Sequence, residues 1–496
     1  MVFSSLSFLY LFLPAVLAVY YLMPAAKNNG ARNAVLLLFS LAFYYVGEQR
    51  LVLLMIVSTL VDYACGRVIG ELGEKKDADG NVVRRNWLRR LALGVSLCFN
   101  LGLLAYFKYA DMLIGLANAL TGAGLPLLEI ALPIGISFYT FQTMSYTIDV
   151  YRGRTRAQKN LLTFACYVTI FPQLIAGPIV RYSEIEEQLT ARRFDRAQMT
   201  GGIHRFCLGL AKKVLLADQL AILVKLADSG EDPTLLMTWA AAVALPLQIY
   251  YDFSGYSDMA IGLGAMFGFS FPENFDYPMS SRSATEFWRR WHMTLGGWFR
   301  DYLYIPLGGN RVGDGRLVLN LLIVWATTGL WHGASWHFVL WGLYYGVLII
   351  AEKLFARRFP DRGKLPRRIL SRIWFFLVTV VGFQIFGAAD LPDLGARLAR
   401  LVGVGTTGFA SPVTLYYLRN DAVLLLLSLV LAFPVMKTLV RKAGQTALCQ
   451  KKLADGSTFG EHAGLILASV LSLLALITVT AFLIDGSYSP FLYFRF

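Results

Sequence analysis

Long apolar segments recur along the whole chain, from Leu6 to Ile484, and short polar stretches separate them. Lipid offers no partner for unpaired backbone groups, so such segments are expected to cross a membrane as helices. Allowing about 20 residues for a full crossing, we predict an all-α, polytopic membrane protein with roughly 10–13 membrane segments, including short or re-entrant helices. The segments are 3–23, 34–46, 51–65, 91–106, 133–148, 161–179, 204–226, 235–249, 317–325, 335–350, 373–386, 423–435 and 464–484.

The segment 161–179 is rich in helix-breaking residues. It contains Phe171-Pro-Gln-Leu-Ile-Ala-Gly-Pro178, and proline lacks the backbone N–H that a helix interior needs. A continuous straight helix is therefore not expected. Irregular backbone at membrane depth is tolerated only where protein or a cavity covers it, so we predict a broken and covered segment.

Polar side chains follow the apolar segment 235–249. Two interpretations are open: they line a wet cavity, or the carboxylates cap the ends of a broken helix. The side chains are Asp252, Ser254, Ser257 and Asp258. The preceding apolar segment, 204–226, also carries charges, at Lys212, Lys213 and Asp218.

The chain is basic, with 46 Lys and Arg against 32 Asp and Glu and a formal charge of +14. The positive-inside rule explains most of this excess. It places Lys27 and Arg32 in the cytoplasm, and hence the N-terminus outside. If 34–46 and 51–65 each cross the membrane, the basic loop 67–90 is cytoplasmic too. Nucleic-acid binding is not indicated, because the chain has no long basic tail and no nucleic-acid module.

The chain shows no soluble domain and no repeat of fixed period, so we interpret 1–496 as a single transmembrane domain. Its five cysteines form no CxxC pair, and we predict neither a disulfide framework nor a metal site. The segment 269–316 contains the longest stretch that is too polar to span. We predict that it is interfacial or cytoplasmic.

A helix is predicted to begin at Ser283-Ala-Thr-Glu286, which has the form of a capping box. Its apolar residues fall within one arc of about 120°, which predicts an interfacial helix with an aromatic underside. They are Phe287, Trp288, Trp291, Leu295, Trp298 and Phe299. His292 lies just beyond this arc, and Gly296 and Gly297 are expected to weaken or bend the helix.

The segment 281–316 contains several arginines but no lysine. A planar guanidinium can bind two phosphate oxygens at once, so Arg289, Arg290 and Arg300 are candidates for holding substrate phosphates. The alternative, which the pattern alone favours, is contact with lipid headgroups.

Two histidines, His332 and His337, lie in the apolar stretch 325–341. A histidine at membrane depth is costly unless it faces a cavity or has a partner, so His332 is a candidate functional residue. A packed, hydrogen-bonded core residue is the alternative. The tryptophans expected to enclose His332 are Trp331, Trp336 and Trp341. Spaced about 140° apart around a helix, the two histidines do not form a chelating pair.

Several motifs together resemble the membrane-bound O-acyltransferase (MBOAT) family over nearly the whole chain. They are Phe171-Pro-Gln-Leu-Ile-Ala-Gly-Pro178, Tyr251-Asp-Phe-Ser-Gly-Tyr-Ser-Asp-Met-Ala-Ile-Gly262, Glu273-Asn-Phe275, Thr285-Glu-Phe-Trp-Arg-Arg-Trp-His292, Arg300-Asp-Tyr-Leu-Tyr-Ile-Pro-Leu-Gly-Gly-Asn-Arg311 and Gly329-Leu-Trp-His-Gly-Ala334. The two ends of the chain are similar to the subgroup that contains the integral-membrane subunit of bacterial alginate O-acetyltransferases. Arg495 departs from that subgroup, in which glutamine is frequent near the end.

The resemblance implies a multi-helix fold around a central tunnel in the bacterial inner membrane. It implies that His332 is the catalytic histidine and His292 the second family histidine. It also implies transfer of acetyl groups from cytoplasmic acetyl-CoA to an extracytoplasmic polysaccharide, such as an alginate-like exopolysaccharide or a cell-wall glycan. Extracytoplasmic partner proteins commonly complete that transfer.

We hypothesise that His332 is a general base that activates an acceptor hydroxyl, with His292 orienting donor or acceptor. Burial in a water-poor, aromatic site would keep the imidazole neutral and limit hydrolysis. One alternative is a transporter or channel for an acyl carrier, sugar or lipid, with the histidines as a proton relay. Another is an MBOAT enzyme that acts on a lipid or a protein.

Overall fold

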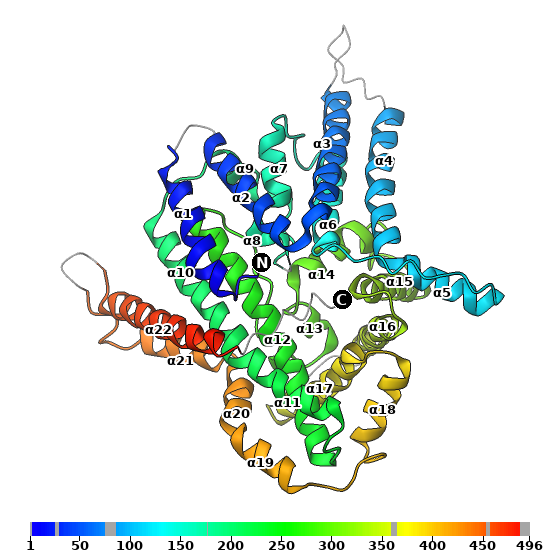
Figure 1. Ribbon diagram of the computed structural model, residues 1–496, viewed down its shortest axis with the longest axis vertical. Helices are drawn as coiled ribbons and strands as arrows, with labels where there is room; N and C mark the ends of the chain where they lie inside the picture. Colours follow the sequence, from blue (N-terminus) through cyan, green and yellow to red (C-terminus); the bar gives the residue numbers. More distant parts are fainter. Residues whose placement is uncertain are drawn as a thin grey trace. The chain divides into compact units, whose positions relative to one another are not determined.

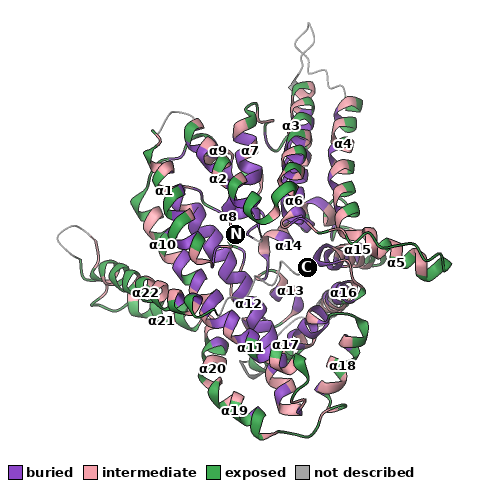
Figure 2. Cartoon of the chain, viewed as in Figure 1, coloured by how far each residue is buried: buried purple, intermediate pink, exposed green. Residues whose placement is uncertain are grey.

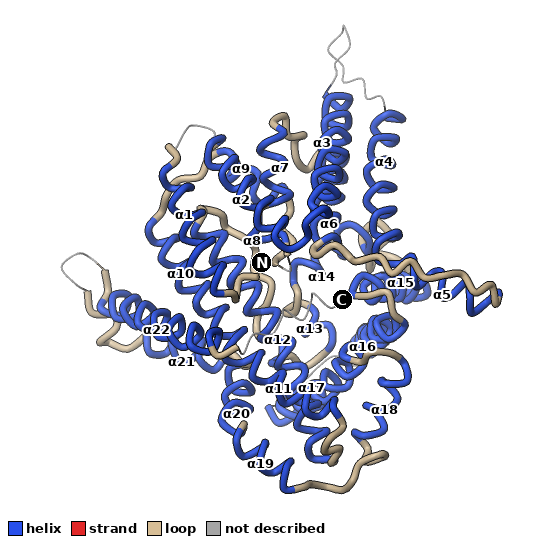
Figure 3. Tube along the Cα trace, in the orientation of Figure 1, coloured by secondary structure: helices blue, strands red, loops and turns tan. Residues whose placement is uncertain are grey.

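The computed structural model describes residues 2–24, 29–74, 86–175, 177–358, 365–452 and 457–486. These residues form helices and loops, and the β contact among them is an isolated bridge between Lys452 and Thr458 (Figure 3). The all-α prediction is therefore confirmed. Lys27, the basic residues of 75–85 and Arg495 lie outside the described residues, as does the C-terminal motif.

The chain divides into two compact units, and α10 and α12 contribute residues to both. Unit 1 comprises 1–203 and 260–272, and unit 2 comprises 204–259 and 273–496. The prediction of a single domain over 1–496 stays a prediction.

Unit 1 holds the N-terminal helices (Figure 1). They are α1 (Leu13–Leu22), α2 (Gly30–Glu48), α3 (Val52–Glu74), α4 (Asn86–Leu104), α5 (Ala110–Thr121), α6 (Ile136–Arg152), α7 (Leu161–Thr169), α8 (Phe171–Leu174), α9 (Tyr182–Thr190) and the first part of α10 (Arg196–Ala211). The π-helices η1 (Phe8–Phe12) and η3 (Ala105–Tyr109) and the 3-10 helix η2 (Gln49–Leu51) extend or join them.

Unit 2 holds the remaining helices and all the histidines of the chain (Figure 1). They are η4 (Lys212–Ala217), α11 (Asp218–Ser229), most of α12 (Leu235–Met266), η5 (Pro278–Ser280), α13 (Ala284–Trp288), α14 (Met293–Phe299), η6 (Arg300–Tyr304), α15 (Asp314–His332), α16 (Trp336–Arg358), α17 (Leu365–Gly387), α18 (Leu391–Leu401), α19 (Pro412–Asn420), α20 (Ala422–Leu431), α21 (Val435–Gly444) and α22 (Phe459–Ile484).

The broken segment predicted around 171–178 is confirmed in unit 1. Asn160 caps α7, which ends at Thr169, and the four-residue α8 follows. The backbone N–H of Phe171 donates to Ser40 Oγ of α2 at 3.0 Å. The Ser40 hydroxyl thus accepts a hydrogen bond from a backbone N–H at the point where the helix is interrupted.

Helix α12 is continuous, although it contains Pro246. It is buried over most of its length (Figure 2). Asp252 and Asp258 lie in its interior, so the interpretation that they cap the ends of a broken helix is wrong. Both carboxylates instead bind basic side chains of the segment that joins α10 to α11.

Five helical segments are long and apolar enough to cross a membrane, and a sixth appears if α19 and α20, bent by 52°, count as one span. The five are Gly30–Gly73, Asn86–Thr121, Trp336–Phe355, Ile369–Gly387 and Phe459–Ile484. This number for the described residues is smaller than the 10–13 membrane segments predicted. The difference arises because many predicted segments form helices that are short, such as α7, or polar, such as α6.

The helix predicted from Ser283 is interrupted. Ser283 caps α13 as expected, because its Oγ accepts the N–H of Glu286 at 3.1 Å. However, α13 ends at Trp288, and α14 begins only after His292, which has a left-handed backbone with φ of 45°. The prediction of one continuous helix is therefore wrong, and the break lies at His292 and not at the glycines 296 and 297.

Candidate active site

His332 is the last residue of α15, and Gly333 follows it in an extended conformation. The imidazole is 3% exposed. Its ring centroid lies 5.0 Å from that of Trp331, 4.8 Å from that of Trp341 and 5.4 Å from that of Phe386. His332 is thus held in a buried, aromatic environment at a helix end.

One of the three predicted tryptophans does not belong to this enclosure. Trp336 is the first residue of α16 and is 49% exposed, because it faces away from the protein there. The third wall of the site is instead Phe386 of α17. Nothing in the apolar run 373–386 distinguishes Phe386 from its neighbours, so sequence reasoning missed it.

Glycines bring α15 and α16 into close contact beside His332. A Cβ atom added at Gly329 would lie 2.3 Å from the carbonyl oxygen of Phe338, and one at Gly342 would lie 2.2 Å from that of Trp325. Such distances are too short for any other residue. The absence of side chains at these positions therefore sets the position of the helix that ends in His332.

Gly329→Ala is expected to lower both activity and thermal stability, because α15 must move away from α16 to admit the methyl group. Overpacking of this kind costs about 1–3 kcal/mol. Thermal unfolding and turnover of the purified protein would measure the two effects. Gly315→Ala is the matched control, since a Cβ atom at Gly315 in the same helix meets nothing within 4 Å. Equal behaviour of the two variants would contradict the packing argument.

A cavity of about 530 Å³ lies next to the connection between α15 and α16. This volume is within the range of about 300–1,000 Å³ that is typical of small-molecule sites. Gly333, the residue after His332, lines the cavity, as does Phe338. The Phe338 ring lies 5.2 Å from Phe386, which in turn contacts His332. His332 is thus separated from the cavity by one layer of aromatic side chains.

His337 lies in the wall of this cavity, and Ser335 Oγ is 2.8 Å from its Nδ1. The two histidines of 325–341 therefore have different surroundings, since His332 is enclosed by rings and His337 lines the cavity.

Buried charges form another part of the cavity wall. Lys213 Nζ lies 2.7 Å from Asp218 Oδ1 and 2.8 Å from Asp252 Oδ1. All three side chains are at most 6% exposed. Asp252 lines the cavity as predicted, whereas Ser254, Ser257 and Asp258 are not among its lining residues. A lysine and an aspartate five residues apart in an apolar segment were the sequence signal for this ion-pair network.

His292 is 1% exposed and lies against the rings of Phe253 and Trp331, with centroids 4.7 and 6.0 Å away. Burial lowers the pKa of His292 to about 3, so the imidazole is neutral at physiological pH. Its Nδ1 is 3.0 Å from Asn274 Oδ1. Trp331 contacts both His292 and His332, so one indole lies against both predicted site histidines. Asn274 was missed as a site residue, although it lies within one of the motifs.

The three candidate arginines do not line the cavity. Arg290 binds Glu286 at 3.0 Å, and Arg300 binds Asp301 at 2.8 Å. Arg289 is exposed. The aromatic residues of the same segment pack against protein, since Trp288 lies 5.3 Å from Trp341 and Trp291 lies 5.2 Å from Phe383.

Among the described residues, no three His, Cys, Asp or Glu side chains are grouped to hold a metal ion.

Residues 125–389 match the model of the MBOAT, membrane-bound O-acyltransferase family. The chain is also 40% identical to the probable alginate O-acetylase AlgI of Pseudomonas putida, and the alignment covers 100% of both chains. The chain belongs to the membrane-bound O-acyltransferase family. It is therefore a membrane enzyme, an O-acyltransferase that uses an acyl donor.

Two further relatives of this MBOAT protein act on different polymers. It is 31% identical to a peptidoglycan O-acetyltransferase of Helicobacter pylori over 85% of this chain and 82% of that protein. It is 27% identical to a teichoic acid D-alanyltransferase of Bacillus subtilis over 51% of this chain and 68% of that protein. Both histidines and most of the cavity wall lie within the matched family region.

Proposed function

We propose that this enzyme transfers acetyl groups from cytoplasmic acetyl-CoA across the inner membrane for O-acetylation of an extracytoplasmic polysaccharide. The full-length similarity to alginate O-acetylases supports an alginate-like acceptor, and the similarity to a peptidoglycan O-acetyltransferase supports a glycan more generally. The main support for the proposal is the position of His332. It is buried among aromatic rings, and one layer of aromatic side chains separates it from a cavity lined by charged residues.

In the proposed reaction, His332 removes the proton of an acceptor hydroxyl, and the oxygen attacks the thioester carbonyl of the donor. The carbon–sulfur bond then breaks, and the imidazolium returns its proton to the departing CoA thiolate. A neutral imidazole can accept this proton, and burial among aromatic rings disfavours the charged imidazolium before the reaction. The aromatic enclosure would exclude water and so limit hydrolysis of the thioester.

His292 would orient the donor or the acceptor in this mechanism. Arg289, Arg290 and Arg300 are proposed contacts for the CoA phosphates. Of the three, Arg289 fits best, because acidic side chains already occupy Arg290 and Arg300. We also propose that an extracytoplasmic partner protein transfers the acetyl group to the polymer. A central tunnel and an N-terminus on the extracytoplasmic side complete the proposal.

The test is turnover of acetyl-CoA labelled in the acetyl group by the full-length protein in lipid nanodiscs. We expect thioester cleavage, with release of free CoA, that accelerates when a hydroxylated glycan oligomer is added and labels it. Sealed vesicles provide a second measurement. Uptake of intact acetyl-CoA without cleavage would contradict the proposal and support a transporter.

A further inference from the structure

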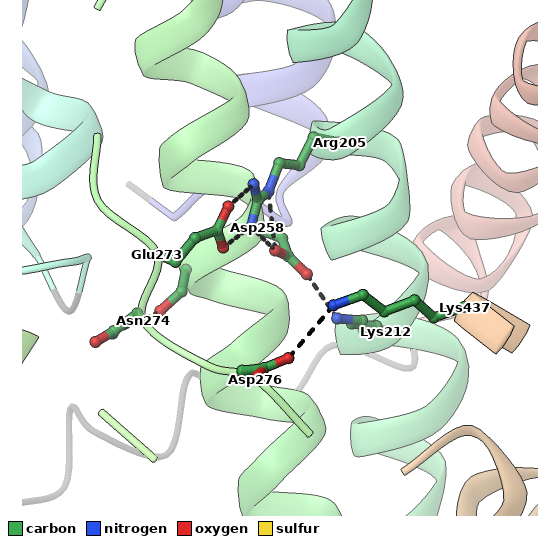
Figure 4. Close-up of polar contacts among 8 residues, drawn as sticks. Arg205, Lys212, Asp258, Glu273, Asn274, Asp276 and Lys437 are labelled. Atoms are coloured by element: carbon green, nitrogen blue, oxygen red, sulfur yellow. Dashed lines mark hydrogen bonds and ion pairs between the residues drawn. The ribbon is translucent and has the colours of Figure 1, made fainter. Parts of the chain in front are cut away.

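In the loop that follows α12, Glu273 is held by an ion-pair cluster (Figure 4). Arg205 of α10 binds Glu273 at 2.5 Å and Asp258 of α12 at 2.9 Å. Lys212 binds the second oxygen of Asp258 at 2.6 Å. This part of the loop is therefore anchored to α10 and, through the shared Arg205, to α12.

The other end of the loop is held as well. The N–H of Asp276 donates to the carbonyl oxygen of Arg290 at 2.9 Å. The Asp276 carboxylate lies 3.7 Å from the Arg290 guanidinium and 3.6 Å from Lys437 Nζ. Between these anchors, Asn274 is 1% exposed, and its side chain points away from the ion-pair cluster (Figure 4).

The amide of Asn274 can have only one orientation in these surroundings. Its Oδ1 lies 3.3 Å from the backbone nitrogen of Thr294, and a backbone N–H can only donate. Thr294 Oγ1 also donates to Oδ1, at 2.9 Å, while Nδ2 donates to Ser257 Oγ at 3.0 Å. Turning the amide over would place two donors face to face at Thr294, so the oxygen must face His292.

This orientation determines where the proton of His292 resides. Nδ1 of His292 is 3.0 Å from Asn274 Oδ1, an atom that only accepts hydrogen bonds. Nδ1 must therefore carry the hydrogen. A neutral imidazole has a single N–H, so the lone pair lies on Nε2.

We propose that Asn274 is a positioning residue that holds His292 as the Nδ1–H tautomer, so that His292 meets substrate with Nε2 as a hydrogen-bond acceptor. The tautomer itself follows from the contacts of Asn274. The statement about substrate rests on the proposed function.

The chemical consequence concerns what His292 can bind. An Nε2 lone pair accepts a hydrogen bond from a hydroxyl or an amide N–H, but it cannot donate one to a carbonyl oxygen or an oxyanion. His292 is thus assigned to a hydrogen-bond donor of the substrates other than the reacting hydroxyl, such as a second hydroxyl of the acceptor or an amide N–H of the donor, and not to stabilising the negative charge that develops on the thioester oxygen. Removal of the proton of the reacting hydroxyl is then left to His332.

The groups around His292 allow this assignment to be tested by pH. Neutral residues pack against it: Phe253 from α12, Trp331 from α15 and Asn274 from the loop. The charged residues of the same segments already have partners. They are Asp252, which binds Lys213, Asp258, which binds Arg205 and Lys212, Glu273, which binds Arg205, and Arg290, which binds Glu286.

The first experiment is solid-state NMR of the full-length protein in lipid bilayers, labelled with ¹⁵N-histidine. The chain has five histidines, and His292→Gln identifies the signal of His292. We expect its two nitrogen shifts to show protonated Nδ1 and unprotonated Nε2, without titration between about pH 5 and 8. A protonated Nε2 in the wild-type protein would overturn the proposal. This result does not depend on acetyl transfer, so it separates a failure of the proposal from a failure of the proposed function.

The second experiment compares Asn274→Asp with Asn274→Leu. The aspartate keeps an acceptor at Nδ1, but its negative charge favours the imidazolium and raises the pKa of His292. We expect the acid-side loss of kcat to move to higher pH and His292 to titrate in the NMR spectra. The leucine leaves Nδ1–H without its acceptor, and we expect kcat to fall about tenfold or more at all pH values.

Asn420→Asp is the matched control, because it introduces the same carboxylate at an exposed amide of α19. It should change neither the pH profile nor the His292 spectrum. If Asn274→Asp and Asn274→Leu are folded and keep the wild-type kcat and pH profile, the positioning role is wrong. If the leucine variant does not fold, the NMR titration of the aspartate variant decides the question.

Discussion

Replacing His332 with alanine is expected to abolish acetyl transfer and to leave the protein folded. Loss of a general base typically lowers a rate by about 10²–10⁴-fold. The imidazole packs against the rings of Trp331, Trp341 and Phe386, and the smaller side chain leaves that packing partly intact. The measurement is kcat for release of CoA from acetyl-CoA, together with the elution profile and melting temperature of the purified protein.

His204→Ala is the matched control for this experiment. His204 lies in α10, and its Nε2 is 3.1 Å from Ser469 Oγ of α22, on elements that do not line the cavity. We expect near-normal turnover from this variant. Full turnover by folded His332→Ala would show that another group is the base.

Lys213→Met is expected to destabilise the protein by about 3–5 kcal/mol, the usual cost of leaving a buried charge without its partner. Lys213 is the cation between Asp218 and Asp252, and all three side chains are almost completely buried. Methionine has a similar length but no charge. The two carboxylates would then repel each other across the cavity wall.

Thermal unfolding in detergent and the yield of monodisperse protein would measure this loss. A triple variant with Asp218→Asn and Asp252→Asn in addition to Lys213→Met removes the unpaired charges, and we expect it to recover much of the stability. Lys442→Met, at an exposed position of α21, controls for the substitution itself. A single Lys213→Met variant as stable as the wild type would contradict the assigned role of this ion-pair network.

Sequence reasoning succeeded where a local signal has a direct physical meaning. Two prolines within 171–178 cannot continue a helix, and the structure has a break there. A histidine between tryptophans at membrane depth indicated a buried, aromatic site, and His332 has one. The carboxylates after residue 249 indicated a polar cavity wall, which Asp252 forms.

The errors arose where a contact distant in sequence overrides a local pattern. Periodicity predicts one helix from Ser283 onward, because it assumes an unbroken backbone. The backbone N–H groups of Met293 and Thr294 bond instead to the carbonyl and side-chain oxygens of Asn274, at 3.0 and 3.3 Å. These contacts satisfy the donors that a helix through His292 would have used. The sequence of 283–300 alone does not show that Asn274 supplies these hydrogen-bond acceptors.

The balance of charges in the cavity wall bears on how substrates arrive. Three of its lining side chains are bases and three are acids, although the chain as a whole carries +14. The bases are Lys213, Lys225 and Arg397, and the acids are Asp218, Asp228 and Asp252. Opposed charges cancel at a distance, so the cavity attracts neither polyanions nor cations over a long range. Entry of a ligand would therefore depend on shape and hydrogen bonding and would change little with ionic strength.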